Sequence, residues 1–379
     1  MSGGVAILGA GGFVGARVLE MATLGGRTDL VPVVRAYRSI ARSAHLGASY
    51  RLGDASRPAS LESALAGCDA VVNLTMDDAD KILPTTKNIY AAAVAAGARV
   101  LVHLSSAAVF GQVDRSDLPD DAPPQLDHWM PYAREKGRAE EFLRERMGDG
   151  RLAIVVLRPG LVWGPGSPWV LGPATDLLRG AAYLVGEGRG SCNLVFIDNL
   201  VRSIDAVVTH SDPMSGFYNV ADDEKKTWRD YYTALAAGLG VDMSAVQAVA
   251  DDHYHAGPRD VLATVQSHTF YRWLKDRVSA QTRAALKLRL AAIRSRSRGA
   301  SEWNGTATGP AVTREMWHLQ ATRYPLPNAR FRAAFGDQNE TSFASAMAAS
   351  LAWLRFIGLD DRDDKLVLGA AARVGAGSN

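Results

Sequence analysis

At 379 residues the chain is long for a single domain, so two lobes or one domain with a large insertion are expected. Hydrophobic residues make up 47% and the net charge is only +2, so the overall charge does not favour nucleic acid or an anionic membrane as a partner. Cys68 and Cys192 lack metal-ligand spacing and cannot form a disulfide framework, which suits a reducing cytosol.

The N-terminal residues are small and apolar but lack the basic region of a signal peptide. No uninterrupted apolar run approaches the ~18 residues that a membrane span needs. We therefore expect a cytoplasmic protein with no stable membrane insertion and no nucleic-acid partner.

The first 160 residues alternate short apolar runs with helical segments. Strands are predicted at 5–8, 30–34, 69–75, 99–106 and 152–160, and helices at 15–22, 60–65, 89–96 and 135–146. Short apolar strands separated by helices are typical of a parallel sheet covered on both faces. The expected fold class is therefore α/β, a doubly wound parallel sheet.

After Gly164 the pattern loosens and Pro and Gly become frequent. A strand is predicted at 195–197, and helices at 199–208, 228–238 and 342–356, with a polar helical region over about 250–340.

The stretch "ILGAGGFVG" lies between the first predicted strand and the first predicted helix. Gly9, Gly12 and Gly15 are spaced at intervals of three, with Gly11 between them. Glycines in this context let backbone N–H groups approach a pyrophosphate at the positive end of a helix. The predicted cofactor loop consists of Gly9, Gly11, Gly12, Phe13, Val14 and Gly15.

This loop makes the N-terminal part of the chain a dinucleotide-binding domain, predicted over residues 1–164 with 191–221 returning to it. Residues 165–190 and 222–357 are predicted to form a smaller, mostly helical substrate lobe, and 358–379 a flexible tail.

The segment after the second predicted strand favours NADP over NAD. A carboxylate at this place binds the ribose 2'-hydroxyl of NAD, whereas arginines suit a 2'-phosphate. The sequence supplies Arg35, Arg38 and Arg42, with no acid between Asp29 and Asp54. NAD remains the second choice, since the arginines could belong to a solvated helix start. Asp54 is a candidate contact to the adenine, or simply a turn residue.

The segment "YAREK" places Tyr132 and Lys136 one helical turn apart on the same face. Ser105 and Ser106 follow a predicted strand, at the edge where open α/β sheets place their ligands. These groups suit hydride transfer at an alcohol or carbonyl: the tyrosine exchanges the proton, a serine orients the oxygen and the lysine stabilises tyrosinate. Because a free tyrosine has a pKa near ~10, neutral operation needs a decrease of roughly 2–3 units.

These motifs together resemble an extended short-chain dehydrogenase/reductase, the NAD(P)-dependent epimerase/dehydratase family. The resemblance runs from residue 5 to about residue 357 and rests, in order, on "GAGGFVG", "SSAAVFG", "YAREK", "RPGLVWGPG", "VFIDNLVRSI" and "FYNVAD". It implies a Rossmann fold in which Tyr132 is the acid/base, Lys136 its activator and Ser106 the substrate-orienting hydroxyl.

The resemblance also implies the cofactor contacts. Gly9, Gly12 and Gly15 would hold the diphosphate, and the nicotinamide carboxamide would meet the backbone of Pro159, Gly160 and Leu161. The path from adenine to ribose would be lined by Asp54, Ala55, Leu74 and Thr75. The family leaves a homodimer open, formed through helices such as 84–96 and 135–146.

Departures from the family pattern bear on the reaction. Dehydratases carry an acidic pair where this chain has Ala107 and Ala108, so 4,6-dehydration is not expected. Gly160 replaces an asparagine that contacts nucleotide-sugar substrates, and Cys192 and Asn193 occupy the place of an arginine that grips the diphosphate.

The expected small-molecule substrate is of the sugar type, with epimerisation as one option. One alternative is a ketoreductase resembling 3β-hydroxysteroid dehydrogenases and acting on a lipophilic substrate. The other is a non-catalytic NADP-binding sensor.

Three further features are open to two interpretations each. The basic segment 270–300 is expected to be a solvated helix, with a membrane-surface patch as the alternative. His253 and His255 are expected to lie in a solvated loop, and no metal site is predicted. Packing is favoured over a role in walling the substrate site for His128, Trp129, Trp163 and Trp169.

Overall fold

The computed structural model describes residues 3–41, 43–111, 118–252, 254, 310 and 312–359. The chain divides into two units. The first comprises Met1–Val170, Ser191–Lys226 and Arg323–Ser350, and the second Leu171–Gly190, Thr227–Thr322 and Leu351–Asn379.

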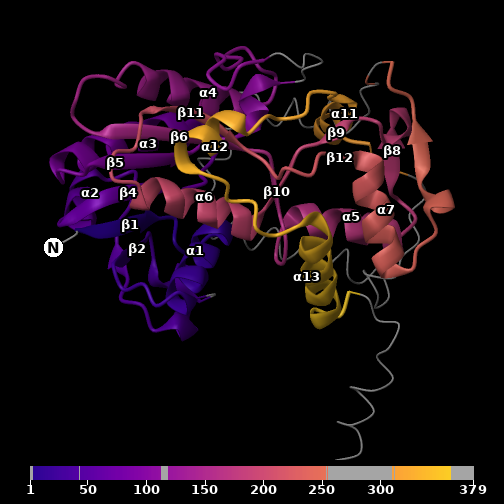
Figure 1. Cartoon of the computed structure of the whole chain (residues 1–379), viewed down its shortest axis with the longest axis horizontal. Coiled ribbons are helices and arrows are strands. Elements are labelled where there is room, and N and C mark those ends of the chain that lie inside the picture. Colours follow the sequence, from indigo (N-terminus) through magenta and orange to yellow (C-terminus); the bar gives the residue numbers. More distant parts are fainter. Residues whose placement is uncertain are drawn as a thin grey trace, which may run out of the picture. The chain divides into compact units, whose positions relative to one another are not determined.

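A seven-stranded, all-parallel sheet forms the centre of the first unit, in the order β11-β6-β5-β4-β1-β2-β3 (Figure 1). Its strands are β1 (Gly4–Leu8), β2 (Leu30–Val34), β3 (Arg51–Leu52), β4 (Cys68–Asn73), β5 (Val100–Leu104), β6 (Ala153–Pro159) and β11 (Gly216–Val220). The predicted doubly wound parallel sheet is confirmed. The sequence analysis had missed the short strand β3 and the edge strand β11.

Helices cover both faces of this sheet because its strands are apolar on both sides. Val5 and Ile7 pack with α1 (Phe13–Leu24), α6 (Ile197–Thr209) and α12 (Ala329–Phe335). Ala6 and Leu8 point the other way, towards α2 (Pro58–Leu65), α3 (Ala79–Ala95) and α4 (Pro131–Arg144). The alternation of side chains along a strand therefore divides the core into two layers.

The carboxyl ends of the strands carry the segments in which the sequence predicts a site. The turn η3 (Ala107–Phe110) follows β5, and η1 (Tyr37–Ile40) follows β2. After β6, the strand β7 (Leu161–Trp163) pairs in parallel with β10 (Leu194–Phe196). A further turn, η2, spans Ala44–Leu46.

The second unit contains a small parallel pair, β8 (Tyr183–Val185) with β13 (Gln247–Val249). Among its described residues it also contains η4 (Gly186–Gly188), α7 (Trp228–Leu239), η5 (Met243–Ala245) and α11 (Arg314–Ala321). The division of the chain into units falls within α5 (Pro168–Leu178), β12 (Lys226–Thr227) and α13 (Phe343–Phe356), and β9 (Ser191–Cys192) belongs to the first unit.

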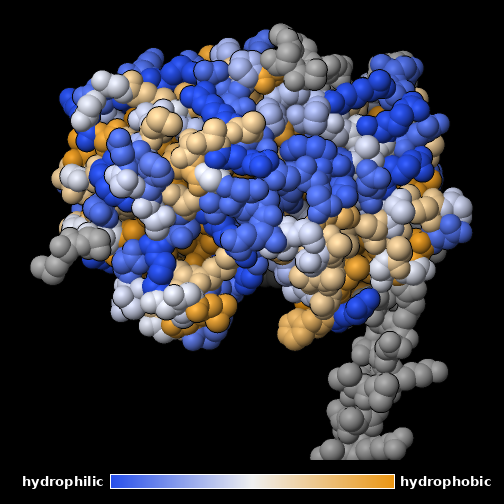
Figure 2. Space-filling model, viewed as in Figure 1, coloured by the Kyte–Doolittle hydropathy of each residue, from blue (hydrophilic) through white to orange (hydrophobic). Residues whose placement is uncertain are grey.

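Among the described helices, none has the length and apolar character needed to span a bilayer. On the face drawn in Figure 2, hydrophilic residues make up most of the surface and hydrophobic residues form smaller groups between them.

Candidate active site

The glycine loop joins β1 to α1 and has little room for side chains. Gly9 has a φ of +82°, and a Cβ there would lie 2.8 Å from the Leu74 carbonyl oxygen. A Cβ on Gly15 would collide with the Gly9 carbonyl, and one on Gly11 with the Ser39 carbonyl. The N-cap of α1 makes no side-chain hydrogen bond, so its first amides are not capped by a side chain. This cradle fits the diphosphate of a dinucleotide.

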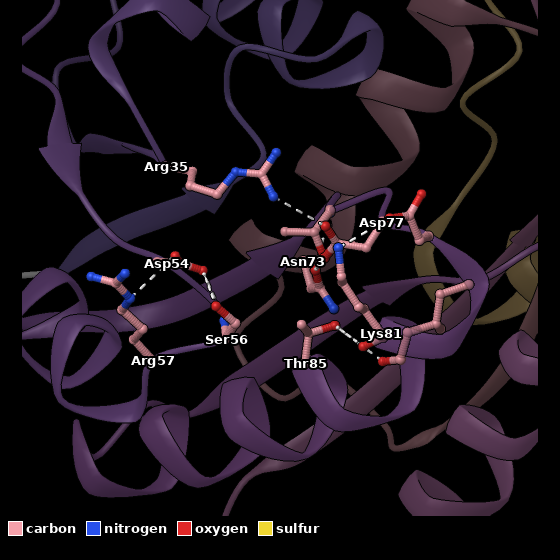
Figure 3. A network of polar contacts seen from close by, with 11 residues as sticks. Arg35, Asp54, Ser56, Arg57, Asn73, Asp77, Lys81 and Thr85 are labelled. Carbon is pink, nitrogen blue, oxygen red and sulfur yellow. Dashed lines mark hydrogen bonds and ion pairs between the residues drawn. The ribbon is translucent and has the colours of Figure 1, made fainter. Parts of the chain in front are cut away.

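Charged residues surround the place where the sequence predicts the adenosine (Figure 3). The exposed Arg35 donates through Nη1 to Asp77 Oδ1 at 3.4 Å. Asp54 accepts hydrogen bonds at Oδ1 from Ser56 N (2.9 Å) and Ser56 Oγ (2.7 Å), and Arg57 lies 3.8 Å from it. The Ser56 hydrogen bonds, then the nearby arginine charges, lower the pKa of Asp54. The basic stretch is therefore accompanied by two carboxylates from elsewhere in the chain.

The other predicted adenosine residues lie close to this group. The Ala55 carbonyl accepts from Asn88 Nδ2 at 2.9 Å, and Leu74 N donates to Leu8 O at 3.0 Å. Arg38 is exposed within η1. Arg42 lies outside the described residues.

Thr75 is held by Asn73, a buried residue that the sequence analysis did not single out. Asn73 Oδ1 accepts from Thr75 N at 3.1 Å and from Thr75 Oγ1 at 2.7 Å. Its Nδ2 therefore faces His103 Nδ1 on the neighbouring strand at 3.0 Å. Because an amide nitrogen can only donate, His103 Nδ1 must accept and its proton must lie on Nε2.

His103 is fully buried, and its Nε2 has no hydrogen-bond partner among the described residues. Burial, with a smaller contribution from the charge of Lys136, holds the pKa of His103 well below its usual range. The ring is therefore neutral at physiological pH.

Tyr132 and Lys136 lie one turn apart near the start of α4, as predicted. Lys136 is buried; its Nζ donates to the Leu104 carbonyl at 2.8 Å and lies 6.0 Å from the centre of the Tyr132 ring. Burial lowers the pKa of Lys136 to about 8, while the charges of Glu140 and Asp77 act in the opposite direction. An ammonium group next to a phenol favours the tyrosinate form.

The two serines after β5 have different surroundings. Ser105 is buried, and its Oγ donates to Glu140 Oε1 at 2.5 Å. Ser106 Oγ accepts from Ala108 N at 3.2 Å, so this contact leaves the hydroxyl proton of Ser106 available to donate. The arrangement favours Ser106 over Ser105 as the hydroxyl that meets a substrate.

Glu140 is also half of a fully buried ion pair with Arg158 that the sequence analysis missed. Arg158 Nε lies 3.0 Å from Glu140 Oε1, and Nη2 lies 2.5 Å from Oε2. Arg158 Nη1 donates to the Asp120 carbonyl at 2.6 Å, and its guanidinium lies 4.7 Å from the ring centres of Phe110 and Phe217. These contacts fix the carboxylate that accepts from Ser105.

The segment predicted to meet the nicotinamide continues from β6, whose last residue is Pro159. Gly160 N donates to Val220 O at 3.0 Å, and Leu161 N donates to Asn193 O at 2.6 Å. A Cβ on Gly160 would collide with that same Asn193 carbonyl. Glycine at this position is therefore a packing requirement.

The side chain of Asn193 is used inside the protein. Its Nδ2 donates to Tyr324 O at 2.9 Å, and its Oδ1 accepts from Leu326 N at 2.8 Å. An amide bonded in this way at both ends has limited capacity to bind a substrate phosphate.

Of the aromatic candidates, Trp163 is fully buried and donates through Nε1 to Asp222 Oδ2 at 3.3 Å, which is a packing role. The His128 and Trp129 rings stack with centres 5.5 Å apart.

The described residues contain no group of three or more His, Cys, Asp or Glu side chains able to hold a metal. His253, His255 and the basic segment 270–300 lie outside the described residues, as do residues 360–379 of the predicted tail.

A seven-stranded parallel sheet with a glycine loop after its first strand in the chain, β1, defines a Rossmann-type dinucleotide-binding fold. Residues 5–221, more than half of the chain, match the model of the NAD dependent epimerase/dehydratase family. The chain therefore belongs to this family of NAD(P)-binding enzymes, which confirms the resemblance recognised in its motifs.

Curated relatives in this family differ in their named activities. The chain is 28% identical over 240 residues to the N-acetyl-alpha-D-glucosaminyl-diphospho-ditrans,octacis-undecaprenol 4-epimerase of Escherichia coli O157:H7, covering 59% of this chain and 68% of that protein. It is 28% identical over 217 residues to the 2-alkyl-3-oxoalkanoate reductase of Stenotrophomonas maltophilia, covering 52% of this chain and 64% of that protein. The chain thus spans about two thirds of the length of these relatives.

Solved structures share the fold over nearly the whole chain. A dTDP-glucose 4,6-dehydratase from Streptomyces venezuelae with NAD bound has a TM-score of 0.66 at 19% identity, covering 93% of this chain and 97% of that one. A UDP-glucose 4-epimerase from Thermotoga maritima with UDP-glucose has a TM-score of 0.64 at 14% identity, covering 93% and 99%.

Proposed function

We propose that the protein is an NAD(P)-dependent oxidoreductase that transfers hydride at a secondary alcohol or ketone, with Tyr132 as acid/base, Lys136 as its activator and Ser106 as the orienting hydroxyl. The observation that carries the proposal is the buried Lys136, anchored to the Leu104 carbonyl at 2.8 Å with its Nζ 6.0 Å from the Tyr132 ring centre.

The proposed chemistry follows from these positions. In the oxidation direction Tyr132 would remove the hydroxyl proton and Ser106 would donate a hydrogen bond to the same substrate oxygen. NAD(P)+, when bound, would accept the hydride. Lowering the pKa of tyrosine from ~10 by roughly 2–3 units corresponds to about 3–4 kcal/mol of preferential tyrosinate stabilisation. Lys136, whose pKa is about 8, is largely an ammonium at neutral pH and supplies part of this stabilisation.

For the cofactor we propose NADP, held at its 2'-phosphate by Arg35 and Arg38, with NAD as the second choice. The diphosphate would lie on the glycine loop, and the adenosine along Asp54, Ala55, Leu74 and Thr75. The lack of room for a Cβ at Gly9, Gly11 and Gly15 supports the proposed position of the diphosphate.

For the substrate we propose a sugar-type molecule, with transient oxidation in an epimerase as one form of the reaction. The epimerases among the relatives support this choice. Ala107 and Ala108 carry no proton-transferring group, so 4,6-dehydration is not proposed.

A ketoreductase acting on a lipophilic substrate is the second candidate. It is favoured by Asn193, whose amide is bonded to Tyr324 and Leu326 rather than left for a diphosphate. The reductases among the relatives are consistent with it.

The test compares Tyr132→Phe and Ser106→Ala with Ser105→Ala as the matched control. Each variant would be offered nucleotide sugars and 3-oxoacyl compounds together with NADP or NAD. The assay measures the amount of product formed and the amount of reduced cofactor. We expect Tyr132→Phe to lose roughly 10²–10⁴-fold in kcat with cofactor binding retained, and Ser106→Ala to lose far more than Ser105→Ala. A non-catalytic sensor would instead bind NADP and turn over no member of the panel.

A further inference from the structure

Arg35 and Asp77 form an ion pair across the carboxyl end of β1. Arg35 directly follows β2, and Asp77 lies in the segment that follows β4. In the sheet, β1 lies between these two strands and leads into the glycine loop. Figure 3 shows the Arg35 guanidinium directed at the Asp77 carboxylate, with Nη1 and Oδ1 3.4 Å apart.

The two members of this pair are not equally anchored. The Arg35 side chain is 65% exposed, whereas that of Asp77 is only 15% exposed. The carboxylate is therefore the fixed member, and the arginine reaches to it from solvent. A contact at 3.4 Å with an exposed arginine is weak, so a stronger anion can draw the guanidinium away.

A second carboxylate, that of Asp54, also lies near the positive charges of this group. Asp54 lies 3.8 Å from Arg57, and the charge of Arg35 is among the causes, after the Ser56 hydrogen bonds, that lower the pKa of Asp54. Two arginines thus face two aspartates at this place (Figure 3). The run of arginines in the sequence suggests an uncompensated basic site, but Asp77, from a different strand end, offsets Arg35.

We propose that Asp77 sets how strongly this site distinguishes NADP from NAD. The inference rests on the proposed binding of the adenosine 2'-phosphate by Arg35. A 2'-phosphate carries between one and two negative charges, so it competes with Asp77 for the guanidinium and is repelled by the carboxylate. A 2'-hydroxyl has no charge and leaves the pair intact. Asp77 therefore moderates the preference for NADP and keeps NAD an acceptable cofactor.

The experiment is a fluorescence titration of the full chain with NADPH and with NADH. Asp77→Asn removes the charge, and Asp78→Asn is the matched control. Asp78 is 79% exposed and pairs with Lys81 at 3.0 Å, so this substitution makes the same charge change one residue further along. Binding is measured rather than turnover because Asp77 also raises the pKa of Lys136.

We expect Asp77→Asn to tighten NADPH about fivefold, which corresponds to roughly 1 kcal/mol, and to change the Kd of NADH by less than about twofold. Asp78→Asn should leave the ratio of the two affinities close to that of the wild type. In an Arg35→Ala background, Asp77→Asn should no longer shift that ratio, because the competition for Arg35 is absent.

Three results would overturn the inference. Weaker NADPH binding in Asp77→Asn would mean that the carboxylate positions Arg35 for the phosphate. Equal effects of Asp77→Asn and Asp78→Asn on the ratio of the two affinities would mean a general effect of charge. An unchanged ratio in Asp77→Asn, while Arg35→Ala abolishes a wild-type preference for NADPH, would refute only the role of Asp77. If the wild type shows no such preference and Arg35→Ala changes nothing, the proposed 2'-phosphate site itself is wrong.

Discussion

Replacing Lys136 by methionine should make the free energy of unfolding less dependent on pH, and it removes the proposed activator of Tyr132. Lys136 is buried on α4, where burial lowers its pKa from the usual 10.5 to about 8. Methionine has a similar length and no charge, so it can occupy the same space.

The sign of the effect follows from proton binding. Below pH 8 Lys136 is protonated in both the folded and the unfolded chain, so it adds no pH dependence. Between pH 8 and 10.5 the unfolded chain still holds the proton that the folded chain has released. The contribution of Lys136 to the free energy of unfolding therefore rises with pH in this range. A difference of about 2.5 pH units at ~1.4 kcal/mol each amounts to about 3 kcal/mol.

The assay is urea unfolding of wild type and Lys136→Met at several pH values from 7 to above 10. The free energy of unfolding of the wild type, minus that of the variant, should rise by about 3 kcal/mol across this range. Subtracting the variant cancels groups that titrate in both proteins, and Lys87→Met corrects for the loss of a lysine as such. A flat difference curve would refute the conclusion that burial depresses the pKa of Lys136.

Two further predictions concern the buried polar groups beneath the site. Glu140→Gln should lower the free energy of unfolding by roughly 3–5 kcal/mol, because it leaves the fully buried Arg158 without its counter-charge. The control Glu141→Gln, on the helix surface, should change the free energy of unfolding by less than about 1 kcal/mol. Urea unfolding of both variants checks this, and equal effects would contradict it. His103 should stay neutral far below its usual pKa because it is fully buried and lies near the charge of Lys136, and its proton should lie on Nε2 because Asn73 donates to Nδ1. Nitrogen NMR of the labelled ring checks both points, and protonation near pH 6.5 would refute the first.

The parts of this protein that the sequence predicts are those with local signals. The strands β1, β2, β4, β5 and β6 are short, mostly apolar runs, and the glycine loop is a contiguous motif between a strand and a helix. Tyr132 and Lys136 are one helical turn apart, so their common face follows from the helix period. The edge strand Gly216–Val220 is only five residues long and includes Gly and Asn, so it was not predicted as a strand, and its pairing with β6 defines it.

The parts that the sequence could not predict are contacts between segments that are distant along the chain. Arg35 and Asp77 are 42 residues apart, and Asn73 and His103 are 30 apart. Each of these pairs joins residues on, or just beyond, different strands of the sheet. Their proximity depends on the strand order, which a single sequence does not contain. The apparent absence of an acid near Arg35 is therefore a property of the sequence and not of the folded surface.

Glu140 shows why fold stability and the proposed chemistry cannot be separated at this place. The same carboxylate neutralises the buried Arg158, accepts a hydrogen bond from the Ser105 hydroxyl and raises the pKa of Lys136 against the effect of burial. If Glu140 carried no negative charge, Lys136 would be less protonated at neutral pH and would stabilise a tyrosinate at Tyr132 less well. The ion pair thus supports the sheet and helix that carry the site while keeping the lysine in the charge state that the proposed reaction needs.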